Sequence, residues 1–327
     1  MRLCAPLLFR PVYQRLVWGG RRLANWRTDL PAGPVGESWE LADHARGMSL
    51  VAEGAWAGQS LRQLVEQAGP ELVGRGFAGG PFPVMVKILD AADRLSVQVH
   101  PDDEIARRLG LGPNGKSECW FVLSDGGALY QGTRRGVDRH AFESALASGG
   151  ALADLLNRFE SAAGDVFFLE ARTVHALGAG CLLYEVQQTS DVTFRVYDWD
   201  RLGLDGKPRP LHVAESLATI DFARDGFGPH QPAWQSLPGG VGARSLADCP
   251  YFVLEQYRIP AGANLPFTSV EACAVITCVE GAGVLRTEEG RATIAAMQTA
   301  LIPAAAQSWQ ATAGPQGLEV LVATPRL

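Results

Sequence analysis

The sequence predicts a mostly β protein, built from antiparallel strands in a larger first module and a smaller second one. Its 37 glycines and 20 prolines separate many short runs that are rich in valine, leucine, phenylalanine and tyrosine. This punctuation is typical of antiparallel strands joined by turns and argues against regularly alternating strands and helices. The strands expected in the first module are Ser38–Ala42, Val84–Leu89, Ser96–His100, Glu118–Leu123, Val166–Leu169, Leu182–Gln187 and Thr193–Tyr197.

Helices are expected to be few. A short amphipathic helix follows Ser60, which can serve as its N-cap. Two more are expected within about 138–160, on either side of Gly149 and Gly150, because leucine, alanine and phenylalanine recur there with helical spacing. A fourth is expected over about 211–222 for the same reason.

These patterns divide the chain into two domains. Residues 1–222 are predicted to form the first domain with its helical insertions, and the Gly-, Pro-, Gln- and Ser-rich stretch 223–250 is predicted to be a linker or crossing segment. Strands resume over 251–327, a length suited to a second small barrel or sandwich. The strands expected there are Phe252–Tyr257, Ala272–Val279, Gly283–Thr287, Ala292–Ala296, Thr299–Pro303 and Leu318–Ala323.

Composition narrows the class of protein. A hydrophobic content of 47% indicates a folded globular chain. The net charge of −6, with scattered basic residues, argues against nucleic acid as a partner. No apolar run reaches the roughly 18 residues that a membrane helix needs. The six cysteines form no CxxC pair, as expected for free thiols in a reducing compartment. We therefore expect a soluble cytoplasmic protein that does not contact membranes.

The stretch Leu95–Asp102 is an unusual strand. Its alternation places Val97 and Val99 on one face and Ser96, Gln98 and His100 on the other. Buried polar groups are costly unless they are bonded, so a strand that directs an amide and an imidazole into an interior needs a compensating partner. A metal ion would satisfy both groups.

Further donors follow along the chain. Glu118 shares a strand face with Trp120, and His175 follows a strand that begins after a turn. Together with Gln98 and His100 they give four nitrogen and oxygen donors without a thiolate, a set suited to Zn, Mn, Fe or Co. Because the donors come from different strands, their spacing alone also allows each histidine to be a structural residue.

A dense polar block runs from Tyr184 to Arg201 and contains Glu185, Asp191 and Arg195. It allows two interpretations. It could be a charged surface hairpin, or it could be the floor of a polar pocket in which an arginine stabilises an oxyanion and a carboxylate moves protons.

These motifs together resemble the short bacterial form of type I mannose-6-phosphate isomerase, a zinc-dependent cupin. The resemblance covers most of the first two-thirds of the chain, and the C-terminal part is similar only as a cupin-like shape. It implies a cupin (jelly-roll) β-barrel catalytic domain, followed by a smaller cupin-like β domain without metal ligands. The stretches that carry it are Val17–Gly20, Gly36–Glu40, Val86–Asp90, Leu95–Glu104, Gly115–Leu123, His175–Gly178 and Glu185–Arg201.

The resemblance also implies roles for individual residues. It implies one zinc ion per chain, held by Gln98, His100, Glu118 and His175. Arg195 falls at the position of the family's catalytic arginine. Lys116 and Ser96 fall where the family contacts phosphate or substrate, with Lys116 also in a catalytic position. Glu185 and then Asp191 are the candidates for the proton-transferring base, with a metal-bound water as a third.

The implied reaction interconverts mannose 6-phosphate and fructose 6-phosphate through an enediolate, in a monomer or homodimer. Two alternatives stay open: a cupin oxygenase with redox-active iron, and a non-catalytic cupin that only binds sugar phosphates. Gln98 in place of an imidazole, together with the cations Lys116 and Arg195, favours an anionic substrate and non-redox chemistry over the oxygenase.

One residue departs from the family pattern. Arg172 stands where the family usually has the glycine of Pro-Ala-Gly, just before Thr173-Val-His175. Glycine adopts positive φ readily and arginine does not. Either the turn that presents His175 differs here, or Arg172 reaches toward the substrate.

Overall fold

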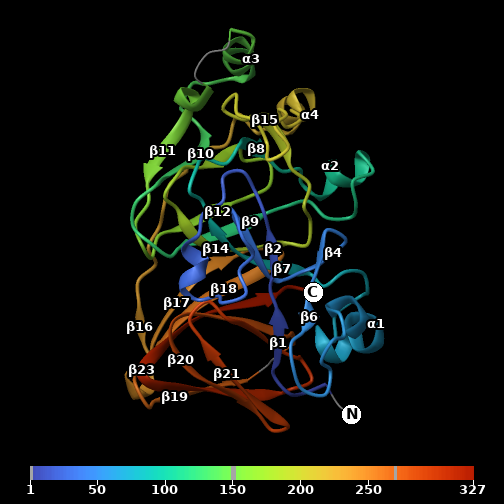
Figure 1. The fold of residues 1–327 in the computed structure, drawn as a ribbon, viewed down its shortest axis with the longest axis vertical. Helices are drawn as coiled ribbons and strands as arrows, with labels where there is room; N and C mark the ends of the chain where they lie inside the picture. The colour runs from blue at the N-terminus through green and yellow to red at the C-terminus, as the bar shows by residue number, and fades with distance from the viewer. Residues whose placement is uncertain (1–2, 149–151, 269–270) are drawn as a thin grey trace. The chain divides into compact units, whose positions relative to one another are not determined.

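The computed structural model describes residues 3–148, 152–268 and 271–327, and it is mostly β (Figure 1). The chain divides into two compact units, both discontinuous in sequence. We call residues 13–38 and 87–231 the site unit, and residues 1–12, 39–86 and 232–327 the C-terminal unit. The domain limits at 222 and 250 remain predictions, and the observed division adds that the N-terminal third contributes to both units.

The first sheet of the site unit has five antiparallel strands in the order β11-β10-β13-β8-β15. One face, which carries Val97 and Val99, packs on an apolar cluster that includes Phe142 and Leu217. The opposite face of the same strand carries Gln98 and His100, as its alternation predicted. The strands are β8 (Val97–Val99), β10 (Ala128–Thr133), β11 (Leu156–Glu160), β13 (His175–Leu177) and β15 (Phe194–Tyr197).

The second sheet has the order β12-β9-β14-β7-β3-β2. β2, β3 and β7 contain residues of both units. All seven residues of β7 are buried, including Lys87 at its centre. The strands are β2 (Val12–Gln14), β3 (Glu37–Leu41), β7 (Val84–Asp90), β9 (Glu118–Val122), β12 (Val166–Leu169) and β14 (Leu182–Gln188). Together with the first sheet they include every strand expected in the first module.

The helices partly differ from the prediction. α1 (Leu61–Leu72) begins at Ser60 with a capping box to Gln63, as expected. α3 (Arg139–Ala147) and α4 (Val213–Thr219) also confirm expected helices, and α4 packs against β15 (Figure 1).

The expected helix after Gly150 is wrong. Residues 149–151 lie outside the described ranges, and η2 (Leu152–Leu155) is a single 3-10 turn that leads directly into β11. Pairing of β11 with β10 outweighs the local helical spacing of the leucines. Two short helices were not expected, η1 (Arg22–Asn25) and α2 (Asp103–Arg108), the latter capped by Asp102. Among the described residues, no helix is long and apolar enough to cross a membrane.

The C-terminal unit contains a ten-stranded sheet, with the path β16-β17-β18-β23-β20-β22-β1-β6 and with β19 and β21 joined to β23 and β20. A separate hairpin pairs β4 (Asp43–His44) with β5 (Gly47–Met48). The ten strands are β1 (Leu7–Arg10), β6 (Leu50–Val51), β16 (Gln235–Ser236), β17 (Gly242–Asp248), β18 (Phe252–Ile259), β19 (Asn264–Thr268), β20 (Ala274–Thr287), β21 (Gly290–Ala295), β22 (Thr299–Ile302) and β23 (Ser308–Pro325).

Two features of this unit differ from the sequence-based expectation. The two strands expected over 272–287 are one strand, β20, because register shifts on either side of Gly281 let it bend without ending. Gly281 has φ 76°, a conformation that glycine adopts without strain. The stretch 223–250 is also not wholly irregular, since it contains β16, the 3-10 turn η3 (Pro238–Gly240) and β17.

Candidate active site

Strand register brings three of the expected site residues into one row. In the five-stranded sheet, His175 of β13 lies opposite Gln98 of β8, and Arg195 of β15 lies opposite Gln98 on its other side. Directly opposed residues project from the same face of a sheet. His100, two positions after Gln98, projects from this face as well. The row thus runs His175, Gln98, Arg195, with His100 beside it.

The second sheet supplies the carboxylate. Oε1 of Glu118, on β9, lies 3.3 Å from Nε2 of His175, and Oε2 lies 3.7 Å from Nε2 of His100. One ligand atom from each of these three buried residues lies within 4.8 Å of the other two. Three of the four expected metal ligands therefore form a cluster that could hold one ion.

Both imidazoles are oriented for coordination. Nδ1 of His100 lies 2.8 Å from the Val192 carbonyl oxygen, and Nδ1 of His175 lies 2.9 Å from the Thr173 carbonyl oxygen. When Nδ1–H donates to these carbonyls, each Nε2 presents a lone pair to the cluster, an arrangement common among metal-binding histidines. Nε2 of His100 also lies 3.2 Å from Nζ of Lys116. Burial lowers the pKa of His175 to about 4 and the pKa of His100 well below its usual value. Both rings are thus neutral near pH 7, as ligation requires.

Glu118 gives the clearest sign that a cation fits here. Its side chain is fully buried, and Oε1 accepts no hydrogen bond from any described residue. Burial, and then the nearby Glu185 carboxylate, raise the pKa of Glu118 to about 7. Lys116 lies against Oε2 alone, so a metal ion at Oε1 would satisfy the remaining oxygen of this buried carboxylate. The donor set fits a divalent metal.

Gln98 lies at the edge of this cluster. Its Nε2 is 3.3 Å from Nε2 of His175, and its Oε1 accepts a hydrogen bond of 3.3 Å from the Ser96 hydroxyl. The amide end therefore lies next to the candidate ligands. Its role as the fourth ligand stays a prediction.

A chain of alternating charges extends from Glu118. Nζ of Lys116 lies 2.5 Å from Oε2 of Glu118 and 3.9 Å from Oε1 of Glu185. Burial alone would raise the pKa of Glu185, but the ammonium groups of Lys116 and Lys87 lower it below its usual range. Trp120 donates from Nε1 to Oε2 of Glu185 at 2.7 Å. Glu185 is thus held as an oriented carboxylate.

Lys87 was not singled out from the sequence, yet it belongs to this chain of charges. Its Nζ lies 3.3 Å from Glu185 and 3.5 Å from Glu37. Burial disfavours its ammonium, but these carboxylates together raise the pKa above the usual value. The sequence signal was a lysine with apolar residues on both sides in the middle of a strand, where a charge requires a partner.

Arg195 borders the cluster on the side of Ser96. Its Nε donates to the Ser96 hydroxyl at 3.3 Å, and its Nη1 donates to the Pro210 carbonyl at 2.9 Å. These bonds fix the guanidinium beside the row of Gln98 and His175. Asp191 precedes Val192, the residue whose carbonyl orients His100, and its charge helps to raise the pKa of Lys87. The candidate site residues of the two sheets thus lie in one group of neighbouring side chains.

Arg172 keeps a glycine-like backbone. Its φ is 74°, in the left-handed region. Its N–H donates to the His100 carbonyl at 2.8 Å, and its carbonyl accepts from the Asp221 N–H at 3.0 Å. The side chain bonds to the Thr219 carbonyl through Nε at 3.2 Å and lies 3.9 Å from Asp102. The turn therefore has a positive φ at Arg172, and the side chain is bonded to the Thr219 carbonyl.

Comparison with known proteins agrees with this geometry. Residues 7–116 match the family model for the phosphomannose isomerase type I catalytic domain. Mannose-6-phosphate isomerase ManA of Bacillus subtilis is 34% identical over 85% of this chain and 86% of its own length, and the mannose-6-phosphate isomerase of Streptococcus mutans is 32% identical over 94% and 95%. The chain belongs to the mannose-6-phosphate isomerase family.

A solved structure of this family shows the same fold. The crystal structure of the Bacillus subtilis mannose 6-phosphate isomerase superposes with a TM-score of 0.88 at 28% identity, covering 98% of this chain and 99% of the other. The predicted cupin-like, mostly β fold of a mannose-6-phosphate isomerase is thereby confirmed. A candidate metal site of two histidines and one glutamate is present in it.

Proposed function

We propose that this protein is a zinc-dependent aldose–ketose isomerase that interconverts mannose 6-phosphate and fructose 6-phosphate through an enediolate. One observation carries the proposal. Two neutral imidazole nitrogens converge on the buried carboxylate of Glu118, whose Oε1 accepts no hydrogen bond from the described residues, and the cations Lys116 and Arg195 lie in the same site. This arrangement suits a divalent metal and an anionic substrate.

The residues that would hold the zinc are Gln98, His100, Glu118 and His175, one ion per chain. When bound, zinc supplies a Lewis acid that polarises the oxygens of the substrate. Two histidines, one glutamate and a neutral amide leave such a site with net positive charge. That charge favours the proton loss that forms an enediolate.

Arg195 is the residue that would offset negative charge on the enediolate. Its guanidinium is already oriented by Ser96 and Pro210, so little reorganisation is needed when charge develops. Ser96 adds a hydroxyl beside it. Lys116 is almost completely buried and already lies against Glu118. We therefore place its ammonium near the reacting end of the sugar, while the predicted phosphate contacts of Lys116 and Ser96 stay predictions.

Glu185 is the first candidate for the group that moves the proton between C1 and C2. The two lysines hold it ionised, so it can accept a proton, and Trp120 fixes one of its oxygens. Asp191 is the second candidate. The E185Q and D191N variants separate the two: the true base shows loss of tritium exchange between substrate and solvent together with loss of turnover.

Two further properties belong to the proposal. All six cysteines are free and buried, which supports a cytoplasmic location. A monomer or a homodimer remains the expectation for assembly.

A coupled assay tests the function directly. Purified protein is assayed with mannose 6-phosphate, then after complete chelation, and again after zinc is added back. We expect activity to disappear on chelation and to return with about one zinc per chain. Activity that persists without metal would overturn the proposal. Oxygen uptake with bound iron would favour the oxygenase, and tight sugar-phosphate binding without turnover would favour the non-catalytic cupin.

A further inference from the structure

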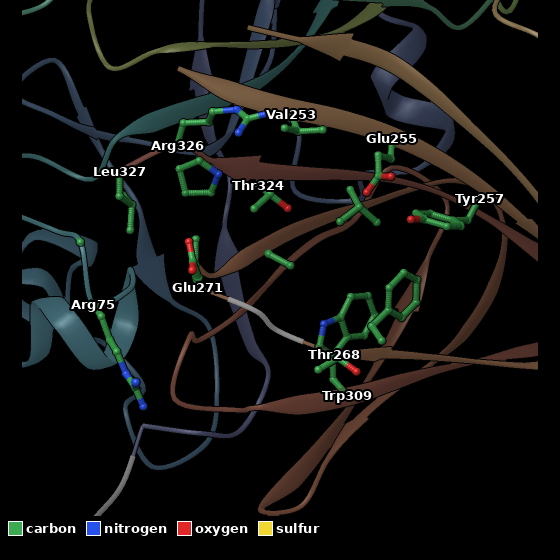
Figure 2. Close-up of a pocket in the computed structure, with 16 residues that line it drawn as sticks. Arg75, Val253, Glu255, Tyr257, Thr268, Glu271, Trp309, Thr324, Arg326 and Leu327 are labelled. Atoms are coloured by element: carbon green, nitrogen blue, oxygen red, sulfur yellow. The ribbon is translucent and has the colours of Figure 1, made fainter. Parts of the chain in front are cut away.

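A cavity lies within the C-terminal unit, with a volume of about 1000 Å³ (Figure 2). All of the residues that line it belong to this unit. The volume is at the upper end of the range for small-molecule pockets. The unit's apolar core, formed by side chains such as Ile276 and Val320, leaves this space unfilled.

Strand β23 builds two sides of the cavity. Its first residues pair with β19, where Trp309 lies directly opposite Phe267, and its last residues pair with β18, where Thr324 lies opposite Val253. The rings of Phe267 and Trp309 are stacked, with centroids 3.8 Å apart and planes 6° apart. The ring of Tyr257 meets Phe267 edge-on at 5.0 Å. One side of the cavity is therefore an ordered aromatic wall.

A carboxylate and a phenol project into the cavity from strand β18. Glu255 and Tyr257 lie two positions apart on β18, so both point to the same side as Val253, and Figure 2 shows their oxygens close together. Burial, and then Glu255, raise the pKa of Tyr257 above its usual value. Both side chains are only half-buried, so they can also bind a ligand hydroxyl.

The charges around the cavity balance. Arg75 and Arg326 are exposed at its border, as is Glu271, and Glu255 lies deeper. Arg326 also pairs with Asp248 at 2.5 Å. The lining therefore has no excess of positive side chains that would favour a phosphate, in contrast with the candidate active site. The cavity is therefore suited to an uncharged polar ligand.

We propose that this cavity is a binding site for a neutral sugar in its pyranose form. The C–H face of a pyranose carries slight positive charge and packs favourably on the negative face of an aromatic ring. Glu255 accepts hydrogen bonds from neighbouring ring hydroxyls, and Tyr257 donates or accepts one more. The aromatic wall and the pair of oxygens stand on adjoining sides of the cavity, so one ring can contact both. The site is separate from the isomerase chemistry and does not depend on it.

Isothermal titration of the full-length, zinc-loaded protein with methyl α-D-mannopyranoside and methyl β-D-glucopyranoside tests the proposal. These glycosides cannot open their rings, so the isomerase reaction cannot consume them. We expect saturable binding of at least one glycoside, weakened at least tenfold in E255A and in Y257F. The control E288A changes an exposed glutamate of the same unit and should bind like the wild type. Isomerase activity should be unchanged in all three variants.

Three outcomes would overturn the proposal. The first is the absence of saturable binding by either glycoside. The second is equal binding by the wild type, E255A and Y257F. The third is competitive inhibition of the isomerase by the glycoside at its dissociation constant, which would place it in the candidate active site. A protein that binds the glycoside but does not isomerise mannose 6-phosphate would refute the proposed function and leave this site intact.

Discussion

The interiors of the two units use similar antiparallel strands for opposite purposes. In the C-terminal unit the inward positions carry side chains such as Ile276, Ile294 and Val320, each of which stabilises the fold by about 1.5–3 kcal/mol when buried. In the site unit, inward positions carry His100, Glu118 and other ionisable groups, whose desolvation costs several kcal/mol per charge. The first interior stabilises the fold. The second is stable only because its charges are paired with one another or with a metal.

His175→Ala should have the largest effect, because it removes a candidate ligand from the polar interior. We expect turnover to fall by roughly 10³-fold or more and bound zinc to fall well below one per chain, since a ligand and its orienting bond to Thr173 are both lost. Metal analysis beside the coupled assay measures both. Full zinc with full activity would show that His175 is a structural residue.

Arg195→Ala should lower turnover by about 10²–10³-fold, the usual cost of losing a group that stabilises an oxyanion. Bound zinc should stay near one per chain, because Arg195 lies beside the cluster without belonging to it. Arg195→Lys is the matched variant and should recover only part of the rate, since one ammonium cannot reproduce the bonds to Ser96 and Pro210. Zinc lost together with activity would mean that the role of Arg195 is misassigned.

Ile276→Ala tests the other interior. Truncation of this fully buried side chain should lower the free energy of unfolding by about 2–5 kcal/mol. Activity per folded molecule and zinc content should hardly change at a temperature where the variant is folded. Urea denaturation followed by fluorescence measures the loss. A large change in activity per folded molecule would show that the two interiors are energetically linked.

The same contrast explains how much could be predicted from the sequence. The alternation of Leu95–Asp102 was sufficient to place Gln98 and His100 on one face. It could not reveal that β13 and β15 flank β8 in the register that adds His175 and Arg195, because pairing of distant strands is set by tertiary structure. Lys87 was missed because its partners Glu37 and Glu185 come from other strands.

Strand limits in the C-terminal unit were less predictable for a related reason. The strand β20 continues through Gly281 because its neighbours follow the bend, although Gly281 locally resembles the end of a strand. The prediction of a helix after Gly150 was also wrong because of strand pairing, since Leu156 pairs with Thr133 of β10. Local spacing indicated where most strands lie, but it did not correctly indicate where each strand or helix begins and ends.

Zinc affinity should depend on pH through Glu118. Its pKa is about 7 without metal, so below pH 7 zinc must displace a proton, and affinity should fall about tenfold per pH unit. His175, with a pKa of about 4, should not compete between pH 5 and 8. Because the pKa of Glu118 is raised in the folded state, its contribution to the stability of the zinc-free protein is present below about pH 4.5 and is lost as the pH rises through 7.

Competition with a zinc-binding dye, measured from pH 5.5 to 8.5, gives this dependence. The matched variant Glu118→Gln should bind zinc more weakly and almost independently of pH. An unchanged slope in that variant would show that another group releases the proton.

The smallest effect should come from Arg172, whose backbone N–H bonds to the carbonyl of His100 while φ is 74°. Arg172→Gly relieves the strain of the left-handed conformation but gives up the bond to Thr219, so the free energy of unfolding should change by less than about 1 kcal/mol. Arg172→Val should cost about 1–2 kcal/mol more than Arg172→Gly, because a β-branched residue rarely adopts this conformation. The valine variant should also bind zinc more weakly, since the turn that leads to His175 would shift. Denaturation of the zinc-loaded variants, with metal analysis, measures both effects, and equal stability of the two variants would show that this turn does not need a positive φ.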